Sequence, residues 1–144
     1  MIKKAVISDA DEIAALAVIL WNSHNVKDLT DEFSDFIQNE NGQIFLKYCE
    51  KTLVGFAQCS IRNDYVEGSS TRPVGYLEGI FVKEEFRGNG YAKELLIECE
   101  RWAKNQGCRE FASDCETEND SSFRFHIKSG FAEANRIICF IKKL

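Results

Sequence analysis

The spacing of apolar residues changes along the first half of the chain, and each change predicts a new element. Apolar residues between Ile13 and Leu20 recur at the three- and four-residue intervals of one helix face. The stretch from Ser8 to Asp11 resembles a helix start with an acidic first turn, and Thr30 to Phe33 resembles a second capped start. The predicted elements are a strand at 2–7, helices from 8–11 to 21–24 and from 30 to 39, and strands at 43–49 and 53–61 joined by a turn at 50–52.

The second half alternates strand and helix patterns after an irregular polar stretch at 63–73 that contains the only proline. An apolar run fills 74–82, and the helix pattern after it stops at Gly107. The predicted elements are strands at 74–82, 110–115 and 137–142, and helices at 90–106 and 119–129. Strand–helix–strand units around a central strand imply an α/β layered fold, and we expect a single domain over residues 1–144.

A glycine-containing turn, Arg87 to Ala92, joins the central strand to the helix after it. Glycines at such a turn let backbone N–H groups converge on an anion at the helix N-terminus. Arg87 adds a fixed positive charge beside them. The turn therefore predicts a phosphate site.

Composition narrows the class of partner. The chain has 144 residues, 44% of them hydrophobic and 11 of them Phe, which is enough for one core. Its net charge of −5 disfavours nucleic acid, which binds basic surfaces. An acidic surface attracts a cationic ligand, although the same charge is also compatible with ordinary solubility.

The six cysteines include no C-x-x-C pair, so we expect reduced, buried thiols rather than disulfides or a metal site. No apolar run approaches the roughly 20 residues of a membrane span. The basic N-terminus lacks the apolar segment and cleavage site of a signal peptide. These features predict a cytoplasmic protein with no membrane partner.

The turn at 87–92 is followed by a second motif in the expected order. Asn119, His126 and the pair Gly130–Phe131 match a signature of Asn, a Tyr seven residues later and a terminal Gly-Phe, with His in place of Tyr. Together with the Arg-x-x-Gly-x-Ala of the turn, this resembles the GNAT superfamily of N-acetyltransferases. The resemblance implies the GNAT fold, a mixed twisted sheet of about six to seven strands flanked by about four helices. It also implies acetyl-CoA as cosubstrate and no metal.

Longer stretches resemble one branch of that superfamily, the aminoglycoside 6′-N-acetyltransferases. They are residues 64–68, 73–82, 112–114 and 139–143, with Trp21 near the end of the first helix. This resemblance covers nearly the whole chain. It implies acetyl transfer from acetyl-CoA to the 6′-amine of an aminoglycoside by direct attack, antibiotic resistance, and a homodimer.

Two carboxylates are the candidate catalytic and substrate-binding groups. Glu78 interrupts an apolar strand, and alternation places it on one face with Tyr76, Ile80 and Val82. It is either solvated at the strand edge or paired with a cation, because burial of an unpaired carboxylate is costly. Asp114 either ends the next strand in solvent or lies at the acceptor site. The attacking amine must lose a proton, and the sequence does not separate Asp114 from Glu78 as the base.

Other residues receive roles from the resemblance. The backbone of Ile80, Phe81 and Val82 is expected beside the cofactor, where an N–H can polarise the acetyl carbonyl. His126 is either a proton donor to the departing thiolate or a structural histidine. Asn119 either contacts the pantetheine arm or caps its helix. The pyrophosphate is expected at the turn residues Arg87, Gly88, Asn89, Gly90, Tyr91 and Ala92.

The acceptor site is expected to include aromatic side chains that stack on sugar rings. Trp21 is either such a residue or part of the core, Tyr65 lies in a polar loop, and His24 is a weaker candidate. Related enzymes often carry a substrate-facing glutamate near the last strand, where this chain has Asn135, which brings no charge.

Two alternatives share the cofactor residues. One is an acetyltransferase for another amine, such as a polyamine or a protein N-terminus, and the other is a non-catalytic CoA-binding module.

Overall fold

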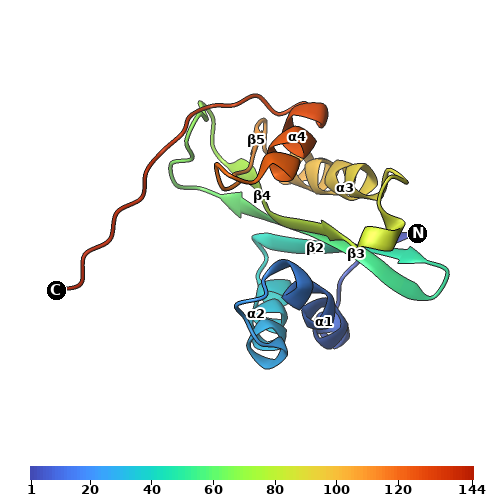
Figure 1. Cartoon of the computed structure of the whole chain (residues 1–144). Coiled ribbons are helices and arrows are strands. Elements are labelled where there is room, and N and C mark those ends of the chain that lie inside the picture. The colour runs from blue at the N-terminus through green and yellow to red at the C-terminus, as the bar shows by residue number, and fades with distance from the viewer.

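The computed structural model describes all 144 residues and contains a five-stranded sheet with helices on both faces (Figure 1). The strands lie in the order β1-β2-β3-β4-β5, antiparallel up to β4, with β5 parallel to β4. They are β1 (Ile2–Lys4), β2 (Gly42–Cys49), β3 (Thr52–Arg62), β4 (Val74–Val82) and β5 (Phe111–Ala112). The predicted α/β class with a mixed sheet is confirmed, but the prediction of six to seven strands is wrong.

Four α-helices, the predicted number, cover the sheet, and they lie two on each face (Figure 1). They are α1 (Ala10–Leu20) and α2 (Val26–Gln38) on one face, and α3 (Tyr91–Asn105) and α4 (Asp120–Lys128) on the other. Two short 3-10 helices, η1 (Ile7–Asp9) and η2 (Glu84–Phe86), precede α1 and α3. None of these helices is long and apolar enough to cross a membrane.

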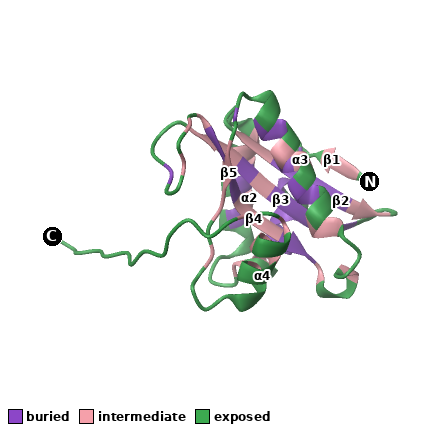
Figure 2. Ribbon diagram, turned by 90° about the horizontal axis from the view of Figure 1, so that it is seen from above, coloured by how far each residue is buried: buried purple, intermediate pink, exposed green.

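Alternating side chains of the strands divide the main core into two clusters. Ile44, Leu46 and Phe56 pack with α1 and α2, whereas Phe45 and Ala57 pack with α3. Figure 2 shows the buried residues gathered in the central strands and exposed residues along α4 and the C-terminal segment. The sheet is therefore held from both faces, which fixes the strands that carry the site.

The second helix begins four residues earlier than predicted. Asn25 caps α2, because its side-chain oxygen accepts a hydrogen bond from the Asp28 N–H at 2.8 Å. Thr30, the predicted start, lies inside the helix, and its hydroxyl donates to the Val26 carbonyl at 2.9 Å. The sequence of residues 30–33 has the pattern of a helix cap, but the cap that is used is Asn25, which lies upstream of it.

The C-terminal segment corrects another prediction. Residues 137–142 form no strand, and the chain extends away from the body after residue 136 (Figure 1). The strand at 110–115 is reduced to Phe111–Ala112. The apolar pattern describes a segment able to form a strand, but a strand also needs a partner strand, and this segment pairs with none in its own chain.

Candidate active site

The turn between β4 and α3 is open and lined with backbone donors. Gly88 and Gly90 adopt φ values of 81° and 80°, which favour glycine, and a Cβ at either position would point into open space. No N–H group of residues 88–93 donates to another part of the chain. The Asn89 side chain braces the turn by donating to the Phe86 carbonyl at 2.9 Å. This arrangement can bind an anion at the start of a long helix.

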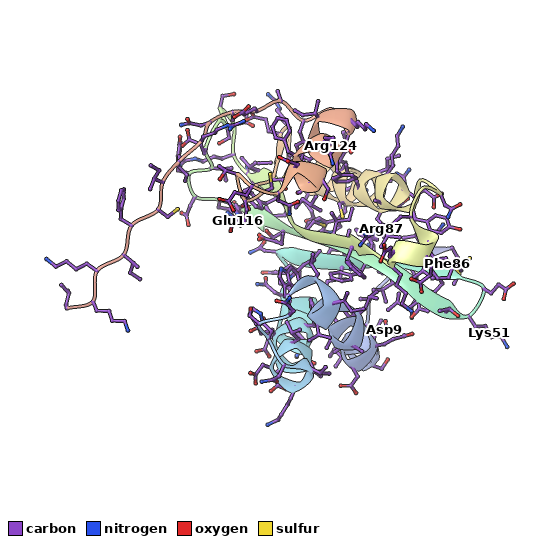
Figure 3. All side chains as sticks on the ribbon, in the orientation of Figure 1. Asp9, Lys51, Phe86, Arg87, Glu116 and Arg124 are labelled. Atoms are coloured by element: carbon purple, nitrogen blue, oxygen red, sulfur yellow. The ribbon has the colours of Figure 1, made fainter.

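Arg87 lies beside this turn (Figure 3). Its Nε donates to the Val82 carbonyl at 2.9 Å, which leaves the rest of the exposed guanidinium available to a ligand. The Tyr91 side chain turns away, toward Cys49 and the Lys47 ammonium, which lies 4.4 Å from its ring centroid. Tyr91 can therefore contribute to an anion site at this turn only with its backbone N–H group.

The strands β4 and β5 separate soon after they meet. Their parallel pairing covers only Gly75 with Phe111 and Tyr76 with Ala112. Beyond that point β4 has no strand partner on this side, so the backbone of the predicted cofactor residues Ile80, Phe81 and Val82 lies along an unpaired edge.

His126 reaches this separation through Ser113. Its Nε2 lies 2.8 Å from the Ser113 hydroxyl, which lies 3.3 Å from the Leu77 carbonyl of β4. Its Nδ1 lies 2.6 Å from the Ser122 carbonyl, which can only accept, so Nδ1 carries a proton. Both ring nitrogens of His126 are thus engaged. Asn119 caps α4 by accepting from the Ser122 N–H at 3.1 Å, which fulfils one of its two expected roles.

A β-bulge places Glu78 at the centre of the site. Leu77 pairs with Cys59 and Gly79 pairs with Gln58, so Glu78 is an extra residue in β4. The alternation resumes out of phase. The prediction that Glu78 shares a face with Ile80 and Val82 is therefore wrong.

The bulge separates these side chains by face. Ile80 and Val82 pack with Leu77 on the α3 side, whereas Phe81 joins the cluster of α1 and α2. At Gly79 an added Cβ would lie 2.8 Å from the Trp21 ring, so the ring packs directly against the backbone of β4 there.

Glu78 is paired with a cation. Arg62 Nη2 donates to both Glu78 carboxylate oxygens, at 2.9 and 3.0 Å, and the Ser60 hydroxyl donates at 2.6 Å. Of the two expectations for Glu78, the cationic partner is the one observed, although the side chain keeps 28% of its exposure. Arg62 and Ser60 were not among the predicted site residues, because their alternate positions on one strand indicate a shared face but not which residue of β4 they contact.

The second carboxylate, Asp114, is joined to the first through Tyr76. The buried Tyr76 hydroxyl donates to Asp114, and the Arg62 guanidinium carbon lies 3.4 Å from the centroid of the Tyr76 ring. Burial, reinforced by the Asp114 carboxylate, raises the pKa of Tyr76 well above its usual range, so the phenol remains a donor. Tyr76 was not among the predicted site residues.

A cavity of about 350 Å³ lies beside Glu78, between α1–α2 and the sheet. Its walls are mainly aromatic and acidic: Trp21, His24, Leu29, Glu32, Phe33, Phe36, Gln58 and Glu78. Trp21 lines this cavity and also packs on Phe33 and Phe56, at 6.3 and 6.1 Å between ring centroids, so it belongs to the core, and its stacking on a sugar ring stays a prediction. Glu32 on α2 was missed, since a glutamate on an amphipathic helix is usually solvated.

Tyr65 and Asn135 meet elsewhere. The Tyr65 hydroxyl and the Asn135 amide donate to Glu67, at 2.9 and 2.8 Å. These two bonds, from Asn135 first and Tyr65 second, lower the pKa of Glu67. Neither residue lines the cavity. The structure thus gathers Trp21, His24 and Glu78 in one cavity and places Tyr65 with Asn135 at a separate loop contact.

Comparison with known proteins agrees with this geometry. A model described as the Acetyltransferase (GNAT) family matches residues 13–131. An aminoglycoside N(6′)-acetyltransferase type 1 of Salmonella typhimurium is 40% identical over 124 residues, which cover 86% of each chain. One from Serratia marcescens is 36% identical over 143 residues, or 96% of this chain and 98% of the relative.

A solved structure is also similar to this chain over its whole length. The structure of AAC(6′)-Iy in complex with the bisubstrate analogue CoA-S-monomethyl-acetylneamine has a TM-score of 0.95 at 35% identity. The match covers 100% of this chain and 98% of that chain.

Proposed function

The chain belongs to the acetyltransferase (GNAT) family, and on that premise we propose that it transfers the acetyl group of acetyl-CoA to the 6′-amino group of aminoglycoside antibiotics. Relatives named for this reaction, at 40% and 36% identity, support the proposal. The observation that carries it is Glu78, which lies on a bulge between an acidic, aromatic-lined cavity and the unpaired edge of β4. A cationic sugar in the cavity would then meet an acyl donor held along that edge, and antibiotic resistance would follow.

The residues that would hold acetyl-CoA fit its chemistry. The free N–H groups of residues 88–93 and the Arg87 guanidinium suit a pyrophosphate. When bound, the cosubstrate supplies an acetyl group activated as a thioester. A backbone N–H among Ile80, Phe81 and Val82 would polarise the acetyl carbonyl, and Asn119 would lie toward the pantetheine arm.

The acceptor amine would be held and deprotonated by the carboxylates. Glu78 faces the cavity, and Asp114 is joined to it through Tyr76 and Arg62. Either carboxylate can act as the base, directly or through water. Trp21 and His24 would contact the sugar from the cavity wall. Tyr65 and Asn135 would act from the loop at Glu67, and His126 would pass a proton toward the departing thiolate through Ser113.

The amine would attack the thioester directly, without an acetyl-enzyme. The whole chain would work as one domain in the cytoplasm, where the thiols of its six unpaired cysteines stay reduced.

We also propose a homodimer formed by exchange of the C-terminal segments. Ile138, Phe140 and Ile141 are 80%, 91% and 97% exposed, which is unusual for a run of large apolar side chains. The two-residue β5 ends the sheet and offers one free edge. A second copy supplies both partners at once, because each extended segment would add a strand to the sheet of the other chain.

An acetyl-transfer assay tests the proposed reaction. Kanamycin, tobramycin, spermidine and a peptide would be compared as acceptors, with Glu78→Gln as the impaired variant. We expect turnover of at least one aminoglycoside and far slower turnover of the other amines. If no aminoglycoside is acetylated, the proposal fails. Turnover of spermidine or the peptide alone would assign another amine, and tight acetyl-CoA binding without any turnover would assign a binding module.

A further inference from the structure

Arg62 connects the two carboxylates that the proposed function assigns to the acceptor amine. Its Nη2 contacts both oxygens of Glu78, and its Nε lies 3.3 Å from the first of them. The same guanidinium lies 3.4 Å from the ring centroid of Tyr76, whose hydroxyl donates to Asp114. The Arg62 guanidinium therefore sets the orientation of Glu78 directly and that of Asp114 through the Tyr76 side chain.

The contact also changes the charge that a ligand meets. Glu78 already has a cationic partner, whereas the side chain of Glu32, which lines the same cavity from α2, forms no hydrogen bond or ion pair. An ammonium that approaches Glu78 therefore meets the positive charge of Arg62 at the same carboxylate. The half-buried position of Arg62 and Glu78, at 42% and 28% exposure, keeps this repulsion from being fully screened.

We propose that Arg62 is a positioning and specificity-determining residue, which aligns Glu78 and Asp114 for the amine and limits how tightly a polycation binds beside them. The inference rests on the proposed function for the identity of the acceptor. Its two effects act on different constants, since alignment governs kcat and the resident charge governs KM.

Lysine cannot replace Arg62 fully. An ammonium keeps the charge, but it lacks the second donor, Nε, that also contacts Glu78, and the flat face that stacks on Tyr76. A lysine variant therefore separates the effect of charge from the effect of alignment.

The test compares three variants in the kanamycin assay: Arg62→Gln, Arg62→Lys and, as a matched control, Arg101→Gln. Arg101 forms an exposed ion pair with Glu98 on α3, so its variant makes the same charge change away from the site. For Arg62→Gln we expect KM to fall about fivefold and kcat to fall at least about tenfold. For Arg62→Lys we expect KM within about twofold of wild type with kcat still low, and for Arg101→Gln both constants unchanged within about twofold.

An unchanged kcat in Arg62→Gln, or full recovery of kcat in Arg62→Lys, would overturn the positioning role. An unchanged or higher KM in Arg62→Gln would overturn the charge role. A crystal structure of Arg62→Gln adds a readout that needs no substrate, because the Glu78 carboxylate and the Tyr76–Asp114 contact should both shift. If wild type acetylates no aminoglycoside, the proposed function fails. Independently of that result, unmoved Glu78 and Tyr76 side chains in the Arg62→Gln crystal structure would refute the role of Arg62.

Discussion

Removal of residues 137–144 should convert the proposed dimer into a monomer. These residues contribute no strand to their own chain, and their large apolar side chains are 65% exposed at Ile137 and 97% exposed at Ile141. Because they add nothing to the core of their own chain, deletion should leave the fold of each monomer intact. The deletion should therefore weaken only the association of the two chains.

The magnitude follows from the apolar side chains of the segment. Full burial of an exposed Ile or Phe contributes about 1.5–3 kcal/mol. The four side chains Ile137, Ile138, Phe140 and Ile141 alternate in direction, so an added strand buries about half of them on one face of the sheet. Each segment then contributes about 3–6 kcal/mol, and two exchanged segments contribute about 6–12 kcal/mol. Their loss should weaken dimerisation by at least about 10,000-fold.

Analytical ultracentrifugation over a range of protein concentrations measures this change. The full chain should sediment as a dimer at micromolar concentration and the truncated chain as a monomer with an unchanged circular dichroism spectrum. Ile138→Asp should weaken the dimer, whereas Ile19→Asp, at a 60% exposed position on α1, should not. A monomeric full chain, or a truncated chain that dimerises equally well, would refute segment exchange.

Three further changes test other parts of the structure. Gly79→Ala places a Cβ 2.8 Å from the Trp21 ring and should destabilise the fold by about 1–3 kcal/mol in urea unfolding; an unchanged midpoint would mean that Trp21 moves freely. Cys115 is the thiol next to Asp114 in the sequence and so the candidate for a covalent acetyl-enzyme; Cys115→Ala should retain most of the acetyl-transfer activity, and near-total loss would contradict direct attack. Glu110 accepts hydrogen bonds from the Thr71 hydroxyl and from the Ser70 and Thr71 N–H groups, and these bonds, the Thr71 hydroxyl first, lower its pKa below 4.5. A lowered carboxylate pKa stabilises the fold above the unfolded value and loses that effect as the pH falls through the folded value. Proteolysis of the 63–73 loop should therefore rise in wild type as the pH falls through the lowered pKa of Glu110 and be high at neutral pH in Glu110→Gln; equal protection in both proteins at neutral pH would contradict this anchor.

Elements with strong local signals were predictable from the sequence. The strand β4 has its predicted bounds, and α4 begins after Asn119 as its cap predicts. These signals lie within a few residues of the boundary that they set, so no distant contact is needed to interpret them. The predicted start of α2 was wrong because two local cap signals compete, and only the structure shows that Asn25 is the cap.

The residues that were missed depend on contacts between distant segments. Arg62 and Glu78 are 16 positions apart and meet because β3 and β4 pair with a particular register. That register is interrupted by the bulge, which alternation cannot reveal in an otherwise apolar strand. Glu32 approaches the same cavity from α2, and its position depends on how that helix packs on the sheet.

The bulge at Glu78 also explains how one strand serves two sides of the sheet. In a regular strand without the bulge, Ile80 and Val82 would share the cavity face with Glu78 and leave the α3 core. With it, Glu78 faces the cavity while Ile80 and Val82 pack with Leu77 against α3. Gly79 completes the arrangement, since the absence of a side chain lets the Trp21 ring close the cavity against the backbone. Relocating the bulge by one residue would therefore move the Glu78 carboxylate and the cavity wall together. The proposed acceptor site thus depends on the same strand, β4, whose free edge faces the proposed acyl donor.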